Sequence, residues 1–387
     1  MVVLAVLATV LLGGTGATTR AAVPGDPPLS IDPAAALAAL HCPATFPRPK
    51  TPVLLVHGTG LTATESWAHT FAKTLPADGH DVCTVDLPDR ALDDAQVAAE
   101  YVVVGIHEVA ARSGRRIDVV GHSQGGLEPR WALKWFPSTR PLVDDYVSIS
   151  STQHGSLDAA GICAVGTCAP SVWQQRPGSK FLNALNAGDE TPGDVSYTSI
   201  YSLTDEVVPE LPPPPTSMLA GARNIELQDV CPGRPADHIS ILWDAVAEAL
   251  VFDALDHPGP ADPARLPANV CLSLAAPGLD VSDIAYMHTV ALGNAAQTTI
   301  ITGPKSSSEP PLMPYVLAAQ TAAATPTPAS GAQPNPTPAA APAPSSPSQP
   351  GVAPAGSLAA TGGGPPVAVA LFLLVLAEVT RRALRVS

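Results

Sequence analysis

The chain has 387 residues and a formal net charge of −14 at pH 7. Its basic residues form no run within the central part of the sequence, which argues against a nucleic-acid-binding role. Six cysteines, an even number, favour an oxidising compartment. Because none of them belongs to a CxxC pair or lies near clustered histidines, the sequence predicts no metal site.

Composition divides the chain into four regions. Residues 1–22 begin with an apolar run that ends in Gly and Ala residues, which is typical of a secretory signal peptide. Residues 28–318 have the length and composition of one folded domain. Residues 319–357 are rich in Pro, Ala and Thr and predict a disordered stalk, because such a segment buries too little apolar surface to fold. Residues 358–387 form a separate C-terminal region.

Within 28–318, apolar runs alternate with helical patterns. Strands are predicted at 52–56, 80–85, 117–121, 145–149 and 197–203. Helices are predicted at 93–112, from the turn after 121 through 135, and at 238–255. This alternation predicts an α/β fold with a mostly parallel sheet and helices on both faces.

A candidate nucleophile lies in the pentapeptide Gly121-His122-Ser123-Gln124-Gly125, between a predicted strand and a predicted helix. In that context G-x-S-x-G predicts a sharp strand-to-helix turn that exposes the serine hydroxyl above the sheet. The flanking glycines let the strand and the helix pass close together. We therefore expect an α/β-hydrolase fold with Ser123 as its nucleophile.

A serine nucleophile requires a histidine base and a carboxylate that orients the histidine, and in this fold they follow the serine in the order acid, then histidine. Asp205 comes just after a predicted strand, with Glu206 as the alternative. His238 opens a predicted helix and is the expected base. His257 in a Pro/Gly-rich stretch and His288 in an apolar segment fit that role less well.

The negative oxygen of a tetrahedral intermediate needs hydrogen-bond donors, which form an oxyanion hole. The backbone N–H of Gln124, directly after the nucleophile, is one expected donor. The Gly-rich turn after the first strand contains Thr59, whose backbone N–H is the other and whose hydroxyl offers a third. Such chemistry needs no cofactor, and none is predicted.

Several stretches together resemble the Candida antarctica lipase B-like family. They are Pro52-Val-Leu-Leu-Val-His-Gly-Thr-Gly60, Ser123-Gln-Gly-Gly126, Ala169-Pro-Ser-Val-Trp-Gln-Gln175, Tyr201-Ser-Leu-Thr-Asp-Glu-Val207, Asp237-His238, Gly303-Pro-Lys305 and Glu309-Pro-Pro-Leu-Met-Pro-Tyr315. The resemblance covers roughly residues 28 to 316 and implies the same triad and oxyanion hole.

The resemblance also implies disulfides Cys42–Cys83 and Cys231–Cys271. These leave Cys163 and Cys168, five residues apart, as an additional local bridge. Residues His122 and Gln175 are expected to border the substrate pocket. At His122 the sequence departs from the family, whose yeast enzyme has Trp before the nucleophile. Residues 155–169 are the segment best placed to cover the site.

The C-terminal region contains Leu358-Ala-Ala-Thr361-Gly362, then a short apolar run and arginines at 381, 382 and 385. It resembles a cell-wall sorting signal recognised by a sortase, with Leu358, Thr361 and Gly362 as its key residues. A GPI signal would end in an apolar tail, whereas this chain ends in arginines. A simple membrane anchor is a second alternative.

Taken together, the sequence predicts a secreted, cell-wall-anchored and monomeric lipase or carboxylesterase. Its partners would be a lipid or ester substrate, a sortase and the cell wall. The alternatives are an acyltransferase or polyester hydrolase that uses the same site, and a wall-anchored binding protein without catalytic activity.

Overall fold

The computed structural model describes residues 25–210 and 215–324. A seven-stranded sheet forms its centre, with the strand order β1-β3-β2-β4-β5-β6-β7. All neighbouring strands are parallel except β1, which pairs with β3 in the antiparallel direction. The strands are β1 (Leu40–His41), β2 (Val53–Val56), β3 (Val82–Val85), β4 (Ile117–His122), β5 (Val143–Ile149), β6 (Ser196–Tyr201) and β7 (Arg223–Glu226).

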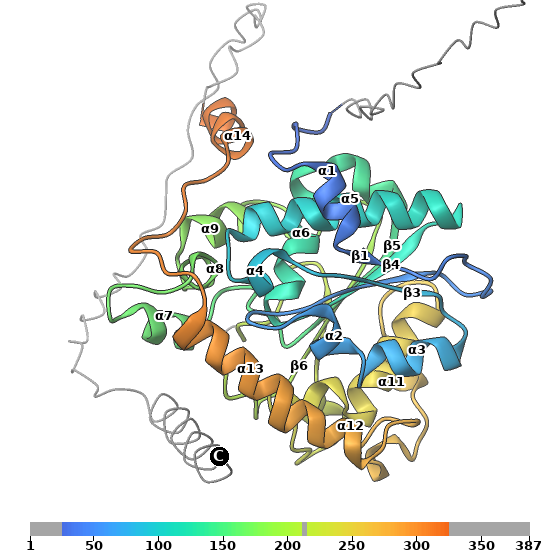
Figure 1. Ribbon diagram of the computed structural model, residues 1–387. Coiled ribbons are helices and arrows are strands. Elements are labelled where there is room, and N and C mark those ends of the chain that lie inside the picture. The colour runs from blue at the N-terminus through green and yellow to red at the C-terminus, as the bar shows by residue number, and fades with distance from the viewer. Residues whose placement is uncertain (1–24, 211–214, 325–387) are drawn as a thin grey trace, which may run out of the picture.

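Helices cover both faces of this sheet (Figure 1). On one face lie α5 (Ala95–Ser113), α6 (Leu127–Trp135) and α9 (Lys180–Asn186), with α1 (Pro33–Ala38) packed on α5. On the other lie α2 (Ala63–Trp67), α3 (Phe71–Asp78), α10 (Leu227–Val230) and α11 (Ala245–Asp256). Strand β2 explains why both faces are covered: Leu54 and Val56 enter one core cluster, while Val53 and Leu55 enter the other.

The remaining helices are peripheral or lie near the carboxyl ends of the parallel strands. They are α4 (Pro88–Ala91), α7 (Leu157–Cys163), α8 (Pro170–Gln174), α12 (Val281–Tyr286), α13 (Leu292–Ala296) and α14 (Pro314–Ala324). Helical backbone continues from α12 through two π-helical turns and α13 as far as Thr302. Among the residues that the structure describes, no helix combines the length and apolar character needed to cross a membrane.

Three local features differ from the sequence-based expectations. The short strands β1 and β7 were not predicted. The helix expected at 238–255 is interrupted, because the Asp244 side chain accepts hydrogen bonds from Val246 N and Ala247 N and so starts α11 at Ala245. At the C-terminal end, α14 continues to Ala324, six residues into the expected stalk, where alanines favour a helix.

Three disulfides join Cys42 to Cys83, Cys163 to Cys168 and Cys231 to Cys271. The first and third are the pairs that the resemblance implied, and the second is the additional local bridge expected between the remaining two cysteines. The first connects the segment after β1 to β3, and the third connects the segment before His238 to the one before α12. The predicted signal peptide, most of the stalk and the predicted sorting signal lie outside the described residues.

Candidate active site

Ser123 stands at a sharp turn between β4 and α6. Its backbone φ is +57°, in the left-handed region that side chains other than glycine seldom adopt. The neighbouring Gly121 has no side chain to collide with the carbonyl of Gly125, and Gly125 in turn packs directly on the carbonyl of Val56. The pentapeptide therefore makes the close approach of strand and helix that the sequence predicted.

The structure brings Ser123, His238 and Asp205 together. His238 Nε2 lies 3.0 Å from Ser123 Oγ, and His238 Nδ1 lies 2.8 Å from Asp205 Oδ2. The other carboxylate oxygen of Asp205 accepts hydrogen bonds from Val207 N at 2.9 Å and Val208 N at 2.7 Å. All three triad side chains are buried. This chain of contacts can transfer a proton from the hydroxyl to the imidazole.

Charge in the site is set by the same contacts. Burial alone opposes ionisation of Asp205, but the adjacent His238 and the backbone donors lower the pKa of its carboxyl below the ordinary value. Burial also opposes the charged form of His238. The negative charges of Asp205, Glu206 and Asp237 outweigh that effect and raise the pKa of His238. Asp205 therefore stabilises the imidazolium that forms when the serine loses its proton.

Thr59 and Gln124, the two expected oxyanion donors, are joined to Gln175 by hydrogen bonds. The Thr59 hydroxyl donates to Gln124 Oε1 at 2.5 Å. Gln175 Nε2 donates to both of these oxygens, at 3.0 Å to Thr59 Oγ1 and 2.9 Å to Gln124 Oε1. Gln124 Nε2 donates to the buried Glu128 at 2.8 Å. The two segments that would surround an oxyanion are thus held in a fixed relation.

Two residues that the sequence analysis did not single out anchor the Thr59 turn. Arg90 Nε donates to the carbonyl oxygen of Gly60 at 3.0 Å, and its guanidinium pairs with Glu65. Thr298, in the helical segment after α13, donates from its hydroxyl to the same carbonyl at 2.8 Å. No motif marks Arg90 or Thr298, because both act through contacts between segments far apart in the sequence.

A cavity of about 400 Å³ opens above Ser123 and His238. Thr59, His122 and Gln175 line it, as do residues of α7 and α13. Most of its wall is apolar, and the apolar contributors are Leu61, Ala159, Ile162, Val165, Val172, Val207, Ile239, Leu292, Ala295, Ala296 and Ile300. Such a cavity accommodates a hydrophobic ligand with a polar group at the serine.

Comparison with known proteins identifies the family of the chain. Residues 50–224 match the family model described as "Lipase (class 2)". The chain is 35% identical over 320 residues to lipase B of Pseudozyma antarctica, covering 79% of this chain and 93% of that protein. The chain belongs to the lipase B family. It is also similar to the crystal structure of Aspergillus fumigatus lipase B, with a TM-score of 0.70 and 34% identity over 76% of this chain and 74% of that chain.

Membership of the lipase B family confirms the resemblance seen in the sequence, together with the α/β-hydrolase fold, and makes the protein a serine ester hydrolase. The alternatives considered for the triad lie elsewhere or act differently. His257 contacts Asp253, and His288 accepts a hydrogen bond from the Trp243 indole. Glu206 lies beside His238 but accepts its backbone N–H at 3.2 Å and not its ring nitrogen.

The sequence analysis missed two acids of this lipase B family member, the buried Glu128 and the half-buried Asp158. Glu128, which accepts from Gln124, has its pKa raised to about 8 by burial. Asp158, at the start of α7, lines the cavity and has its pKa raised to about 6 by burial and then by the charge of Asp205. Asp158 lies within the segment 155–169 that was expected to cover the site. That location is the only feature of the sequence that could have indicated a place for Asp158 near the active site.

Within the described ranges, two groups of side chains could hold a metal ion: Asp78 with His80 and Asp256, and Asp118 with Asp144 and Asp145. None of these residues lines the cavity above Ser123. The ester-hydrolase chemistry of the site is complete without them.

Proposed function

We propose that the protein hydrolyses esters of lipids by an acyl-enzyme mechanism in which Ser123 is the nucleophile, His238 the general base and acid, and Asp205 the residue that orients His238. The observation that carries this assignment is the unbroken series of contacts from Asp205 through His238 to Ser123 on the floor of an apolar cavity.

In the first half of the reaction, Ser123 Oγ attacks the acyl carbonyl while His238 Nε2 takes the hydroxyl proton. The backbone N–H groups of Thr59 and Gln124 bind the negative oxygen of the tetrahedral intermediate. The intermediate breaks its bond to the alcohol oxygen, and His238 returns the proton to that oxygen. In the second half, water attacks the acyl-enzyme by the same route and releases the acid.

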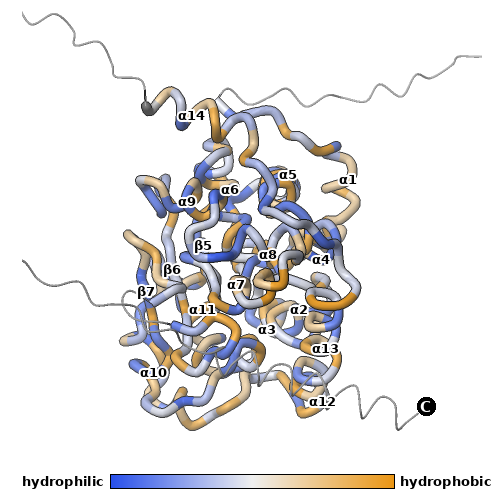
Figure 2. Tube along the Cα trace, turned by 90° about the vertical axis from the view of Figure 1, so that its left-hand side faces the viewer, coloured by the Kyte–Doolittle hydropathy of each residue, from blue (hydrophilic) through white to orange (hydrophobic). Residues whose placement is uncertain are grey.

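A lipid-like substrate is favoured by the mouth of the cavity. Val165 lines the cavity and is 84% exposed, while Leu157 on α7 and Ile301 after α13 are also exposed. Figure 2 faces this side of the molecule, and hydrophobic stretches of the chain lie around α7 and α13. An apolar rim of this kind can contact an acyl chain or a lipid surface.

The experiment that tests the assignment compares wild-type protein with Ser123→Ala. Turnover of a p-nitrophenyl ester should fall on the order of 10⁴-fold or more, with the circular dichroism spectrum unchanged. A serine-directed phosphonate should label the wild type and leave the variant unlabelled. If the variant is labelled at the same rate, or keeps its turnover, another residue is the nucleophile.

Acyl transfer is a second use of the same site, since an alcohol can replace water in the second half of the reaction. Measuring the ratio of transfer to hydrolysis at increasing alcohol concentration distinguishes the two. Cleavage of an insoluble polyester, measured as released acid, tests the third alternative. Loss of every ester-cleaving activity in the purified protein would instead favour a binding role.

The setting that we propose is the outside of the cell, with the chain attached to the wall. The three disulfides are typical of secreted proteins. The signal-peptide pattern of residues 1–22 and the motif Leu358-Ala-Ala-Thr361-Gly362 support export followed by sortase-dependent attachment. A monomer fits this arrangement, because each chain carries its own anchor and its own complete set of active-site residues.

A further inference from the structure

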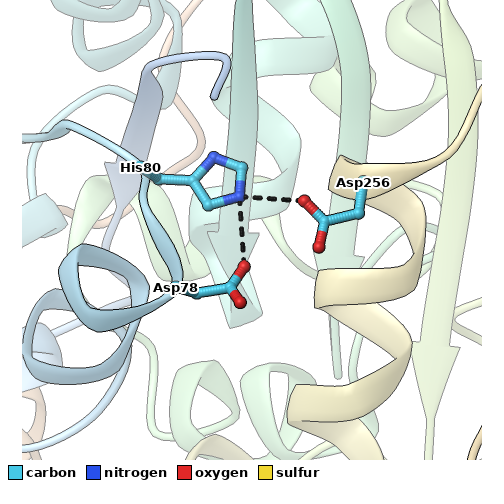
Figure 3. Close-up of side chains that lie close together, drawn as sticks. All are labelled: Asp78, His80 and Asp256. Carbon is cyan, nitrogen blue, oxygen red and sulfur yellow. Dashed lines mark ion pairs between the residues drawn. The ribbon is translucent and has the colours of Figure 1, made fainter. Parts of the chain in front are cut away.

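The turn between α3 and β3 lies against the end of α11 and brings one histidine and two carboxylates together (Figure 3). His80 Nε2 lies 3.5 Å from Asp78 Oδ2 and 3.3 Å from Asp256 Oδ1. Asp78 is the last residue of α3, His80 follows in the turn to β3, and Asp256 is the last residue of α11. The cluster lies where β3 begins, at the amino ends of the parallel strands, whereas Ser123 lies at their carboxyl ends.

The two ring nitrogens of His80 have different surroundings. His80 Nδ1 lies 2.7 Å from the carbonyl oxygen of Thr51, which can only accept, so Nδ1 carries a proton. The side chain of His80 is completely buried, and its Nε2 makes no hydrogen bond within the described part of the chain. A buried ring nitrogen without a hydrogen-bond partner thus faces two carboxylates, an arrangement into which a metal ion can fit.

The dimensions and the donor types match those of a zinc ion. Zinc binds imidazole nitrogen and carboxylate oxygen at about 2.0–2.1 Å in a tetrahedron, which sets neighbouring ligand atoms about 3.3 Å apart. The two distances from His80 Nε2 are close to this value. The hydrogen bond from Nδ1 to a backbone carbonyl is the outer contact that usually orients a zinc-bound histidine.

Lys50 is the cation that now contacts the carboxylates. Its Nζ lies 2.7 Å from Asp78 Oδ2, the oxygen that faces His80, and 2.7 Å from Asp256 Oδ2. One ammonium against two carboxylates leaves a net negative charge. The side chains of Lys50, Asp78 and Asp256 are 33%, 29% and 27% exposed, so Lys50 can turn toward solvent and an ion can enter from that side.

We propose that His80, Asp78 and Asp256 bind a divalent zinc ion, with water as the fourth ligand. Bound there, the ion would connect the α3–β3 turn to the end of α11. It would stabilise the fold on the side remote from the active site. The metal site is independent of ester hydrolysis, so failure of either hypothesis leaves the other unaffected.

The test uses tag-free full-length protein freed of metal with EDTA and titrated with Co²⁺, followed by Zn²⁺. Four-coordinate Co²⁺ should give intense visible absorption, and Zn²⁺ should abolish it by displacement. Zinc should also raise Tm by a few degrees once its free concentration is about 100-fold above Kd. Absence of both signals in the wild-type protein would overturn the proposal.

Four variants locate the site. His80→Asn keeps an N–H that can reach the Thr51 carbonyl but removes Nε2, and it should abolish the Co²⁺ spectrum and the zinc-dependent rise in Tm. Asp256→Asn should weaken metal binding at least 10-fold. If His80→Asn does not fold, this variant alone tests where the ion binds. Lys50→Met removes the competing ammonium and should tighten binding. Asp144→Asn, in the cluster without a histidine, should leave the spectrum unchanged.

Two results would contradict the assignment. Unchanged Co²⁺ spectra in both His80→Asn and Asp256→Asn would show that the ion binds elsewhere. Binding to Lys50→Met but not to the wild type would show that Lys50 closes the site in the natural chain.

Discussion

His122 Nε2 lies 2.9 Å from the backbone carbonyl oxygen of His238, and the two imidazole rings are 4.7 Å apart. Because a carbonyl only accepts, Nε2 of His122 carries the proton. Burial, and then the charge of His238, lower the pKa of His122 to about 3, so it stays neutral and does not compete as a base. His122 therefore lines the cavity and also supports the backbone that presents the expected base.

Replacing His122 by the Trp of the yeast family member should narrow the cavity. An indole fills more volume than an imidazole, so His122→Trp should reduce kcat/KM for bulky alcohol esters about 10- to 200-fold relative to methyl esters. The measurement is kcat/KM for acetates of increasing alcohol size. An unchanged ratio between bulky and small alcohols would mean that His122 does not shape the pocket.

The pH dependence of hydrolysis should follow the protonation of His238. Only its neutral form accepts the serine proton, so activity should fall as the pH decreases through its pKa, which the adjacent carboxylates raise. Glu206→Gln removes one of these charges and keeps an acceptor for the His238 N–H. The acidic limb of kcat/KM should therefore move to lower pH. Glu108→Gln on α5 is the control, and an equal shift there would rule out a local effect.

The Thr59 hydroxyl should matter more for turnover than for binding. Thr59→Val has nearly the same shape but loses the bond to Gln124 and the acceptor for Gln175. It should lower kcat about 10²- to 10³-fold, the range for loss of an oxyanion-hole contact, with a small change in KM. Thr59→Ser should restore most of the activity. Equal activity of the Val and Ser variants would mean that the Thr59 hydroxyl does not contribute to turnover and that only the backbone N–H of Thr59 can.

The Cys231–Cys271 bridge should contribute more to stability than Cys163–Cys168. The first closes a loop of 40 residues and the second a loop of only 5, so the first restricts the unfolded chain more strongly. Replacing Cys231 and Cys271 by Ser should lower the free energy of unfolding by about 2–5 kcal/mol, measured by urea denaturation. A larger loss from the Cys163 and Cys168 double variant would contradict this account.

Attachment to the wall should depend on Thr361. Thr361→Ala should move the protein from muramidase-released wall material to the membrane or the medium. Ser357→Ala, just before the motif, is the matched control and should stay in the wall fraction. Extraction of the wild-type chain by detergent alone, with its C-terminal arginines still present, would favour a membrane anchor over a sorting signal.

Much of the fold followed from local patterns. The strands β2 to β6 contain β-branched and aromatic residues that are largely buried, and the elbow at Ser123 has a motif that determines its geometry. The strands β1 and β7 escaped prediction because they are short and each contains only one apolar residue, Leu40 and Ile225. Their pairing comes from the neighbouring strands β3 and β6.

The contacts around the expected active-site residues were less accessible to sequence reasoning. Arg90 reaches Gly60 from a turn with positive φ, and Thr298 reaches it from a helix more than 200 residues later in the chain. Asp78 and His80 approach Asp256 in the same non-local way. Such neighbours depend on how whole elements pack, and no residue type or spacing within one segment encodes them.

The hydrogen bond from Thr298 to Gly60 joins the wall of the cavity to the turn that carries Thr59. An outward movement of the helical segment from 281 to 302 would break this contact, together with the hydrogen bond from Asn294 to Glu65. Widening the entrance for a large substrate would therefore disturb the turn that carries the expected oxyanion donor Thr59. By thermodynamic reciprocity, a bound substrate that stabilises the Thr59 turn also stabilises the inward position of the helical segment. Substrate binding and closure of the cavity are therefore coupled.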